Sequence, residues 1–422
     1  MTTRRDFLAL TAGAAARWPP IAIAGDLSGR IAGGQGTPDD EPFWARLRNA
    51  YDLDPDVINL DHGWTNPAPR AALDELNRRA RELEALPADR ILRLWEEVTN
   101  VSVRASFAAI LGVPPTEMAF VRNATEALDT VILGLPLKAG DEIVCSAHDY
   151  YAMLDALDQR RRRDGVVIRM VRPPVPAPSL DALAGLYEAE MGPRTRLVLL
   201  TNPSNLTGQL LPARRIAAAA HQVGAEVLVD GAQSLGLLPD PIRSLDCDYY
   251  GASAHKWLGA PIGMGVLWMR PQHAGKVWPM VPPPAHTSGM TRFEWIGTTP
   301  EFIGPALAPA LTVHDTIGTE RKAARLRYLN RYWRRRVATA LPAARFSTTE
   351  DESMSCGICT VSLPGVDHAA LQQRLLKQDG ILVQEMTSPH APEIGGLRVT
   401  PNVYTPQEDL DRFVDALIRA TR

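Results

Sequence analysis

The segment from Glu226 to Lys256 reads EVLVDGAQSLGLLPDPIRSLDCDYYGASAHK, and two short apolar runs within it each lead to a charged side chain. The first run, Glu226–Val229, ends at Asp230, and the second, Tyr249–Ser253, comes just before Lys256. Runs of this length, rich in Val, Leu and Tyr, are typical of β-strands. We therefore expect two neighbouring strands whose carboxyl ends carry an acid and an amine.

The same alternation of short apolar runs with helical stretches extends to both sides of this segment. Further strands are expected at Met118–Val121, Glu142–Cys145, Val166–Val171, Leu197–Leu200 and Val266–Met269. Helices are expected at Arg70–Glu84, Ile91–Leu111, Thr125–Leu133, Leu154–Arg163, Leu180–Met191 and Ala213–Val223. Strands that alternate with helices predict an α/β domain with a mostly parallel sheet and helices on both faces.

The chain has 422 residues, which favours two domains over one. The pattern changes after Thr312, where a long helix is expected at Val313–Leu341. Beyond it we expect strands at Ile358–Leu363, Ile381–Gln384 and Gly396–Thr400, and helices at His368–Gln378 and Pro406–Arg419. We predict a signal peptide at 1–24, a linker or arm at 25–60, a large domain at 61–312 and a small α+β domain at 313–422.

The N-terminus resembles an export signal. Thr3-Arg4-Arg5-Asp6-Phe7-Leu8 matches the twin-arginine pattern, and Ala22-Ile23-Ala24 offers a small-x-small cleavage site after a modest apolar stretch. The twin-arginine route carries folded proteins, so it suits a chain that loads a cofactor before export. We expect a periplasmic or exported protein that uses the twin-arginine machinery. The alternative is a disordered N-terminus whose arginines occur by chance.

Composition excludes several other classes of protein. A net charge of −3 gives no reason to expect nucleic acid as a partner. No apolar run approaches the ~20 residues that a membrane span needs. Cys356 and Cys359 have C-x-x-C spacing, but the sequence offers no second ligand pair for zinc, so we expect no metal site. We interpret these cysteines as structural, with a disulfide or redox role as the alternative.

Asp230 and Lys256 have the chemistry of a site for an aromatic aldehyde. A lysine at a strand end can form an imine, and Ser253 and His255 just before it can donate to a phosphate. An acid that ends an apolar strand needs a partner such as a protonated pyridine nitrogen, and Gln233 could reach a ring hydroxyl. Taken singly, the lysine could be an ordinary strand-end residue and the acid a helix N-cap.

Two further segments add polar groups at other strand ends. Arg122–Ala127 joins a strand to a helix, where backbone N–H groups and Thr125 can bind an anion. Thr201–Gly208 follows another strand, and its polar groups could bind a ring oxygen. An ordinary helix cap and an ordinary turn would use the same residue types. The order of an anion loop, an asparagine turn, an acid and a lysine jointly meets the needs of pyridoxal 5′-phosphate (PLP).

These residues resemble the class V aminotransferase-fold PLP enzymes (fold type I), a group that includes cysteine desulfurases and isopenicillin N epimerase-like proteins. The match runs from about Asn59 to Tyr404, and it includes the patterns Ser204–Gly208, Val229–Gln233 and Ser253–Lys256. The resemblance implies a large domain with a mostly parallel, mixed seven-stranded sheet and a smaller C-terminal α+β domain. It also implies a homodimer with shared active sites.

The resemblance implies a role for each matching residue. Lys256 would be the Schiff-base lysine and proton carrier at Cα, and Arg398 would grip the substrate carboxylate by a bidentate pair. Asp230 would pair with the pyridinium, and Tyr150 would stack on the ring. The remaining cofactor contacts would be Ala124, Thr125, Asn205, Gln233, Ser253 and His255, with Thr298 reaching the neighbouring subunit's phosphate.

Departures from the desulfurase pattern favour one branch of this family over the other. Desulfurases carry a nucleophilic cysteine shortly before the arginine, and Val383–Leu397 contains none. Tyr150, where desulfurases have histidine, and the stretch Arg292–Thr298 resemble the isopenicillin N epimerase-like branch. That branch includes exported enzymes that tailor peptide-derived metabolites such as siderophores. His62, Trp64 and His286 are candidate substrate contacts, with structural roles as the alternative.

The sequence leaves the reaction open. After proton loss at Cα, return of the proton to the other face is epimerisation, return at C4′ is transamination, and loss of a β-substituent is lyase chemistry. We favour an epimerase-like or aminotransferase-like enzyme acting on an amino acid or a peptide-derived amino group, with a C–S or β-lyase as the alternative. A non-catalytic PLP-fold binding protein is disfavoured because Lys256, Asp230 and Arg398 are all present.

Overall fold

The computed structural model describes residues 36–239 and 242–421, so the expected signal peptide at 1–24 lies outside the described residues. A seven-stranded sheet with the order β2-β8-β7-β6-β5-β3-β4 forms the centre of the larger domain. Its strands are β2 Met118–Val121, β3 Glu142–Ser146, β4 Val167–Val171, β5 Thr195–Thr201, β6 Glu226–Asp230, β7 Tyr249–Ser253 and β8 Gly265–Met269. Strand β8 alone runs opposite to the other strands of this sheet, which confirms the mostly parallel, mixed sheet expected.

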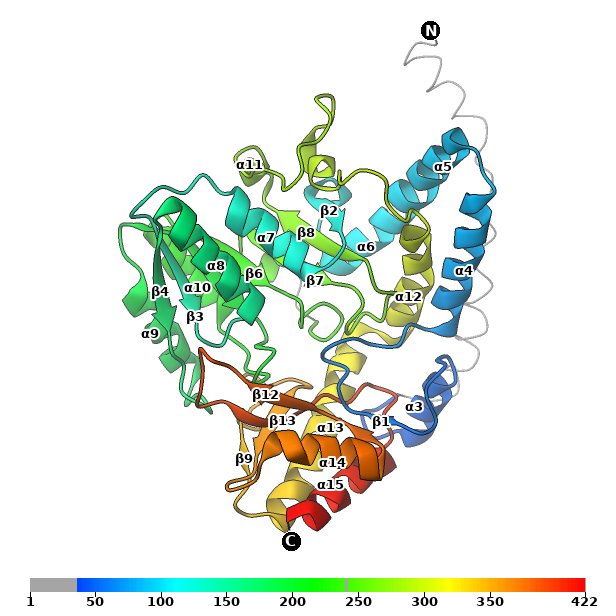
Figure 1. The fold of residues 1–422 in the computed structure, drawn as a ribbon, viewed down its shortest axis with the longest axis vertical. Helices are drawn as coiled ribbons and strands as arrows, with labels where there is room; N and C mark the ends of the chain where they lie inside the picture. Colours follow the sequence, from blue (N-terminus) through cyan, green and yellow to red (C-terminus); the bar gives the residue numbers. More distant parts are fainter. Residues whose placement is uncertain (1–35, 240–241, 422) are drawn as a thin grey trace.

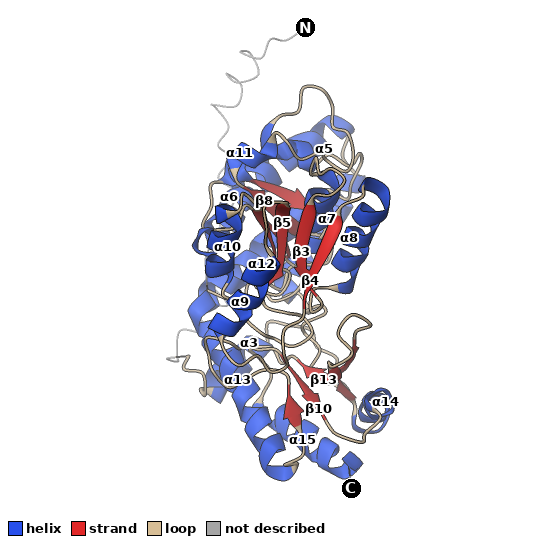
Figure 2. Cartoon of the chain, turned by 90° about the vertical axis from the view of Figure 1, so that its left-hand side faces the viewer, coloured by secondary structure: helices blue, strands red, loops and turns tan. Residues whose placement is uncertain are grey.

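Helices cover both faces of this sheet (Figures 1 and 2). Alternate residues of a strand point to opposite faces, and so Val227 and Val229 join one apolar core while Leu228 joins the other. The helices of this domain are α4 Arg70–Glu84, α5 Ala88–Leu94, α6 Arg104–Leu111, α7 Ala124–Gly134, α8 Tyr151–Asp164, α9 Leu180–Glu190, α10 Ala213–Gln222, α11 Pro271–Ala274 and α12 Ile303–Ile317. Short helical segments are η1 Trp95–Val103, η2 Pro115–Glu117, η3 Ile242–Leu245 and η4 Gly289–Phe293.

The single long helix expected at Val313–Leu341 is wrong. Two helices occupy this region, α12 and α13 (Thr319–Ala340), and they are separated by Gly318. Gly318 has a φ of +84°, which ends the first helix and redirects the chain. Because α12 packs against α4 while α13 packs against α15 (Gln407–Thr421), the turn at Gly318 lies between the large and the small domain.

The smaller domain has a four-stranded antiparallel sheet with helices against it. Its strands, in the order β12-β13-β10-β9, are β9 Arg345–Phe346, β10 Cys359–Ser362, β12 Gln384–Thr387 and β13 Gly395–Val399. Helices α13, α14 (His368–Asp379) and α15 supply apolar residues to its core. This arrangement agrees with the α+β domain expected from the sequence.

The N-terminal segment joins the smaller domain rather than forming a bare linker. Helix α3, Glu41–Arg48, is capped by Asp40, which accepts a hydrogen bond from the Phe43 N–H. Strand β1, Ile58–Asn59, pairs in parallel with β11, Ile381–Leu382. Figure 1 shows this blue segment beside the orange and red C-terminal elements. The segment after β1 is thereby fixed against β13, close to the larger domain.

Among the described residues, none of the helices combines the length and apolarity that a bilayer crossing requires.

Candidate active site

The candidate site lies at the carboxyl ends of three neighbouring strands, β5, β6 and β7. Thr201 of β5 pairs with Asp230 of β6, and Asp230 pairs with Gly251 of β7. Because parallel strands end at the same edge of a sheet, the loops that follow them meet there. The strand ends and their loops carry the expected residues Asn205, Asp230, Gln233, Ser253, His255 and Lys256.

The backbone around Lys256 is held by the segment that follows β1. Asn66 donates its side-chain N–H to the Lys256 carbonyl (3.0 Å) and its backbone N–H to the His255 carbonyl (2.9 Å). Burial lowers the pKa of the Lys256 amine to about 8, while the charges of Asp230 and Asp61 partly oppose this shift. Such an amine holds more of its neutral, nucleophilic form near neutral pH than a surface lysine does.

A second buried lysine, Lys322, has a different environment. Burial lowers the pKa of its amine to about 7. Its Nζ donates to the Trp257 carbonyl (2.6 Å) and lies 3.2 Å from Nδ1 of His314. Lys322 therefore holds the backbone at Trp257, the residue that follows Lys256 in the chain. The sequence offered only the small number of lysines as a signal for it.

Asp230 is the buried acid of the site, with 2% of its surface exposed. Its Oδ1 accepts a hydrogen bond from the Ala232 N–H (2.9 Å). Burial raises the pKa of the Asp230 carboxyl, whereas the Ala232 N–H and the Lys256 charge lower it. A cation in direct contact would stabilise a carboxylate in this position, and the protonated ring nitrogen of PLP is such a cation.

Gln233 has a fixed orientation. The indole N–H of Trp257 can only donate, so the atom of Gln233 that faces it at 2.8 Å must be Oε1. Nε2 of Gln233 then donates to the Gly63 carbonyl, also at 2.8 Å. One N–H of this amide is left over, and it could donate to a ring oxygen as expected.

The anion site expected around α7 has its donors in place. Asn123 caps α7 by accepting from the Glu126 N–H (3.0 Å). The Ala124 N–H donates to Oγ of Ser253 (2.9 Å), and so Ser253 keeps its own hydroxyl hydrogen for a ligand. Thr125 is exposed at the same helix end. The helix dipole favours an anion at this position.

His255 follows Ser253, a residue of the expected anion site, by two positions in the chain. Burial and the charge of Lys256 lower the pKa of its imidazole to about 4, which makes the ring neutral at neutral pH. Its Nδ1 is buried without a hydrogen-bond partner among the described residues. A neutral imidazole has one N–H to donate, and a phosphate oxygen would be a suitable acceptor.

Arg398 reaches the site from β13 of the smaller domain. Its Nη1 donates to the Asn205 carbonyl (3.1 Å), and its Nη2 donates to Oδ1 of Asp61 (2.7 Å). In the described part of the chain, Nε of Arg398 and Oδ1 of Asn205 are buried without a partner. The sequence interpretation missed Asp61 as a site residue, although it lies within the Asn59-Leu-Asp-His-Gly motif.

Tyr150 precedes α8, and its ring packs on that of the exposed Tyr151 with centroids 4.6 Å apart. The two hydroxyl groups are 3.3 Å apart. Burial and then Tyr151 raise the pKa of Tyr150, and Asp230 and Arg398 also influence it electrostatically. Tyr150 is therefore a neutral phenol within electrostatic reach of both charged site residues.

The remaining candidate contacts divide by exposure. His62 is 1% exposed and packs edge-on against Tyr404 (5.6 Å between centroids), which favours the structural alternative for this residue. Burial lowers the pKa of its imidazole to about 3. Trp64, by contrast, is 70% exposed. His286 and Thr298 are exposed in the connection between α11 and α12.

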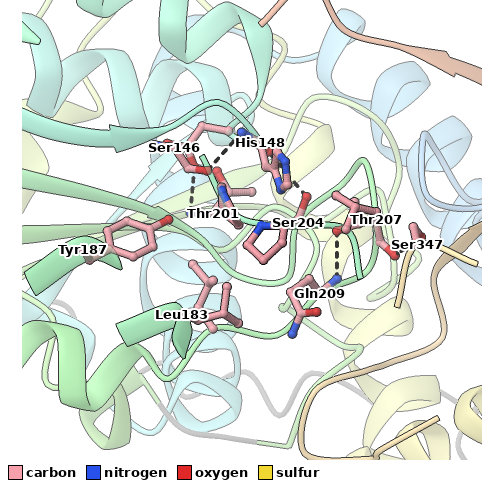
Figure 3. Close-up of a pocket in the computed structure, with 14 residues that line it drawn as sticks. Ser146, His148, Leu183, Tyr187, Thr201, Ser204, Thr207, Gln209 and Ser347 are labelled. Carbon is pink, nitrogen blue, oxygen red and sulfur yellow. Dashed lines mark hydrogen bonds between the residues drawn. The ribbon is translucent and has the colours of Figure 1, made fainter. Parts of the chain in front are cut away.

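A small pocket of about 20 Å³ lies next to the strand ends (Figure 3). Asp149 and Thr201 line it, and the hydroxyl end of Tyr187 points toward Thr201. Asp149 accepts hydrogen bonds from the N–H groups of Ser146 (2.7 Å) and Thr201 (3.2 Å), which ties the ends of β3 and β5 together. Burial is the main cause that raises the pKa of Asp149 to about 7. Lys256 is not among the lining residues, so this cavity adjoins the site rather than forming it.

The side chains of the four cysteines are buried. Cys145, Cys247, Cys356 and Cys359 are all free and at most 2% exposed. The connection between β12 and β13 contains no cysteine, and it docks on the larger domain through His148 and Glu393, whose Nε2 and Oε1 atoms are 3.1 Å apart. Within the described ranges, the side chains of His, Cys, Asp and Glu form no group of three that could hold a metal ion.

These residues fit PLP. Asp230 offers an acid for the ring nitrogen, and Lys256 offers an amine of lowered pKa. The unpartnered Nδ1 of His255 and Oδ1 of Asn205 are the buried polar atoms that a bound ligand would satisfy.

Comparisons with known proteins agree with this arrangement. The model of the family described as aminotransferase class-V matches residues 58–413. An isopenicillin N epimerase of Streptomyces clavuligerus is 32% identical over 398 residues, which cover 89% of this chain and 97% of that protein. A probable cysteine desulfurase of Pseudomonas aeruginosa is 29% identical over 389 residues, with 86% and 93% covered. The solved structure of a cysteine desulfurase from Thermococcus onnurineus has the same fold, with a TM-score of 0.77 at 20% identity, covering 89% of this chain and 97% of that one.

Proposed function

The chain belongs to the class V aminotransferase family of PLP-dependent proteins, and we propose that it moves a proton at Cα of an amino acid or a peptide-derived amino group, as an epimerase does. The observation that carries this proposal is the grouping of Lys256, Asp230 and Arg398. The charges of Asp230 and Arg398 both shift the pKa of Lys256, and Arg398 donates to the carbonyl of Asn205 in the loop after β5. The similarity to an isopenicillin N epimerase over nearly its whole length supports the proposal.

Each of these residues has one task in the proposed reaction. Bound PLP supplies an electron sink for negative charge at Cα. Asp230 would hold the ring nitrogen of the bound cofactor in its protonated form, because a buried carboxylate is stabilised by a cation in contact with it. Arg398 orients the substrate through its carboxylate. The amine of Lys256, with its pKa of about 8, takes the proton from one face of Cα near neutral pH, and epimerisation requires that a proton then returns to the opposite face.

Sulfur transfer through a protein thiol is not favoured. A thiolate must reach the substrate to act as a nucleophile, and burial raises the pKa of the Cys356 thiol to about 12. The other three cysteines are equally buried. Elimination of a β-substituent needs no protein thiol, and the similarity to cysteine desulfurases makes a C–S lyase the second candidate. An aminotransferase uses the same residues up to proton loss.

The reaction can be read from the fate of the Cα proton. The PLP-loaded chain would be incubated in D₂O with a panel of L-amino acids and with isopenicillin N. Deuterium at Cα in both stereoisomers supports the epimerase. A keto acid indicates an aminotransferase, and pyruvate with ammonia indicates a lyase. Absence of solvent deuterium from every substrate would contradict Cα chemistry, and a Lys256→Ala variant provides the background.

We also propose that the chain is an exported homodimer. The twin-arginine pattern at Thr3–Leu8 supports export. Large apolar side chains are exposed, such as Trp64 (70%), Tyr151 (58%) and Ile262 (69%), and this supports a second copy that covers them. Replacing Arg4 and Arg5 by lysine should retain the protein in the cytoplasm if the pattern is used.

A further inference from the structure

Arg398 is already engaged by an acid of its own chain. Oδ1 of Asp61 lies 2.7 Å from Nη2 of Arg398, and both side chains are at most 7% exposed. Burial raises the pKa of the Asp61 carboxyl, whereas the charge and hydrogen bond of Arg398, and then the charge of Lys256, lower it. A buried ion pair therefore lies directly beside the amine of the site.

The backbone of Asp61 is fixed independently of this pair. Thr400 donates its N–H to the Leu60 carbonyl (2.7 Å), and His62 donates its N–H to the Thr400 carbonyl (3.1 Å). Asp61 thus continues β1 alongside β13, the strand that carries Arg398. Asn59 further accepts a hydrogen bond from the Asp61 N–H (2.8 Å). Asp61 therefore offers Arg398 an acceptor whose backbone position is set by the pairing with Thr400.

The hydrogen bonds of Arg398 distinguish two edges of its guanidinium. The end edge consists of Nη1 and Nη2, and both atoms donate within the protein, to the Asn205 carbonyl and to Asp61. The side edge consists of Nε and Nη2, and Nε is buried without a partner among the described residues. A carboxylate can bind either edge of a guanidinium in bidentate fashion. Nε is the one nitrogen of this guanidinium that donates to no group of the described chain, so we assign the edge that contains Nε to a ligand.

We propose that Asp61 is a positioning residue that turns the side edge of Arg398 toward the carboxylate of the substrate. This inference rests on the proposed function, because it needs a substrate that carries a carboxylate. With Asp61 present, the guanidinium is held in one orientation before the substrate arrives, so less conformational entropy is lost on binding. The negative charge of Asp61 also offsets the positive charge of Arg398. Lys256, the second cation of the site, therefore does not face an uncompensated arginine.

Two small amines test the proposal on the PLP-loaded chain. Glycine and methylamine differ by the carboxylate alone, and both change the visible spectrum of the bound cofactor when they react with it. In Asp61→Asn, a neutral side chain of the same shape replaces the acid. We expect the Kd of glycine to rise about tenfold or more, since loss of orientation has effects of this size, while the Kd of methylamine stays within about twofold.

The matched control is Thr400→Val. This variant removes the hydroxyl that accepts from the Gly63 N–H (3.0 Å) and donates to the Leu60 carbonyl (3.1 Å), but leaves the ion pair in place. A general disturbance of the strand pair should change the Kd of both amines alike, in this variant and in Asp61→Asn.

Three results would overturn the role of Asp61: an unchanged Kd of glycine in Asp61→Asn, tighter glycine binding, or equal weakening of both amines. If glycine binds the unaltered chain no better than methylamine does, the carboxylate grip of Arg398 fails, and with it both the proposed substrate class and the inference. If glycine is preferred in the unaltered chain and in Asp61→Asn alike, only the inference fails.

Discussion

At the scale of single residues, Lys256 and Lys322 are both candidates for the nucleophilic amine. Burial lowers the pKa of Lys256 to about 8 and that of Lys322 to about 7, so acidity alone does not distinguish them. Their contacts do. Nζ of Lys322 is committed to the Trp257 carbonyl and to His314, whereas Lys256 interacts electrostatically with Asp230 and Arg398.

Reductive trapping distinguishes the two amines. Treatment of the PLP-loaded chain with borohydride should attach the cofactor to the peptide that contains Lys256, because that amine faces the site acid. Peptide mass mapping locates the adduct. In Lys256→Ala the adduct should be lost while Lys322 remains unmodified. An adduct on Lys322 would overturn the assignment of the nucleophile.

Loading of the cofactor-free chain should depend on pH in a predictable direction. Only the neutral amine attacks an aldehyde, and the lowered pKa means that half of Lys256 is neutral at about pH 8. The rate of PLP incorporation should therefore rise with pH, reach half its maximum near pH 8, and then level off. Nα-acetyl-lysine, an exposed amine, should continue to gain rate above pH 9. A chain that follows the acetyl-lysine curve would show that burial does not tune this amine.

The sequence could point to most residues of the candidate site because they lie in short local patterns. Asp230 and Lys256 follow recognisable strands, and a patterned segment such as Ser253–Lys256 keeps its geometry in the fold. Asp61 and Lys322 were missed for a physical reason. Their roles depend on contacts with residues far away in the chain, Arg398 and Trp257, and no local pattern encodes these contacts.

At the scale of elements, the residues at the N-terminus of α7 stabilise the helix and also form part of the expected phosphate site. The side chain of Asn123 caps the helix at the Glu126 N–H, and the adjacent N–H of Ala124 binds Ser253 at the end of β7. The cap therefore fixes the position of a helix end relative to a strand end. Both ends belong to the expected phosphate site.

Replacing the cap should cost stability in the cofactor-free chain. Asn123→Ala removes the acceptor for one helix N–H, and we expect the free energy of unfolding to fall by about 1 kcal/mol. Asn123→Ser keeps a side-chain oxygen at this position and should recover most of the loss. Urea denaturation followed by circular dichroism measures both variants. Equal stability of Asn123→Ala and the unaltered chain would contradict the role of the cap.

Buried strands were easier to predict than helix ends. The ranges expected for β2 and β7 agree with the structure, since apolar runs at these positions are bounded by polar residues. The expected helix across residues 313–341 failed because apolar periodicity continues through Gly318, and only the positive φ of that residue shows the break. Likewise, the helical run at 91–111 contains the π-helical segment η1, which side-chain periodicity did not reveal.

At the scale of the whole molecule, three separate parts of the chain assemble the site. The larger domain supplies Asp230 and Lys256, the smaller domain supplies Arg398, and the N-terminal segment supplies Asp61 and Asn66. The N-terminal segment contacts both of the others, so the relative position of the domains affects the distance between the amine and the carboxylate grip. A fourth part is expected from a second copy of the chain, through Thr298.

Thr298 offers a test of shared active sites. It is exposed in the connection between η4 and α12, next to Gly297, which has a φ of +85° and open space around it. If this loop reaches the phosphate bound by the other copy, Thr298→Asp places a negative charge against an anion. We expect cofactor affinity to fall about tenfold or more, because like charges in a partly buried site repel strongly. Light scattering should give twice the chain mass for the unaltered protein.

The control for this variant is Thr291→Asp, which adds the same charge at an exposed threonine of η4, the short helical segment that precedes this connection. Its cofactor affinity should stay within about twofold of the unaltered chain, since surface charges are screened beyond about 10 Å. Cofactor binding is measured by titrating the cofactor-free protein with PLP and following its absorbance. Equal affinity in both variants would place Thr298 away from any phosphate, and a monomeric mass would exclude a shared site altogether.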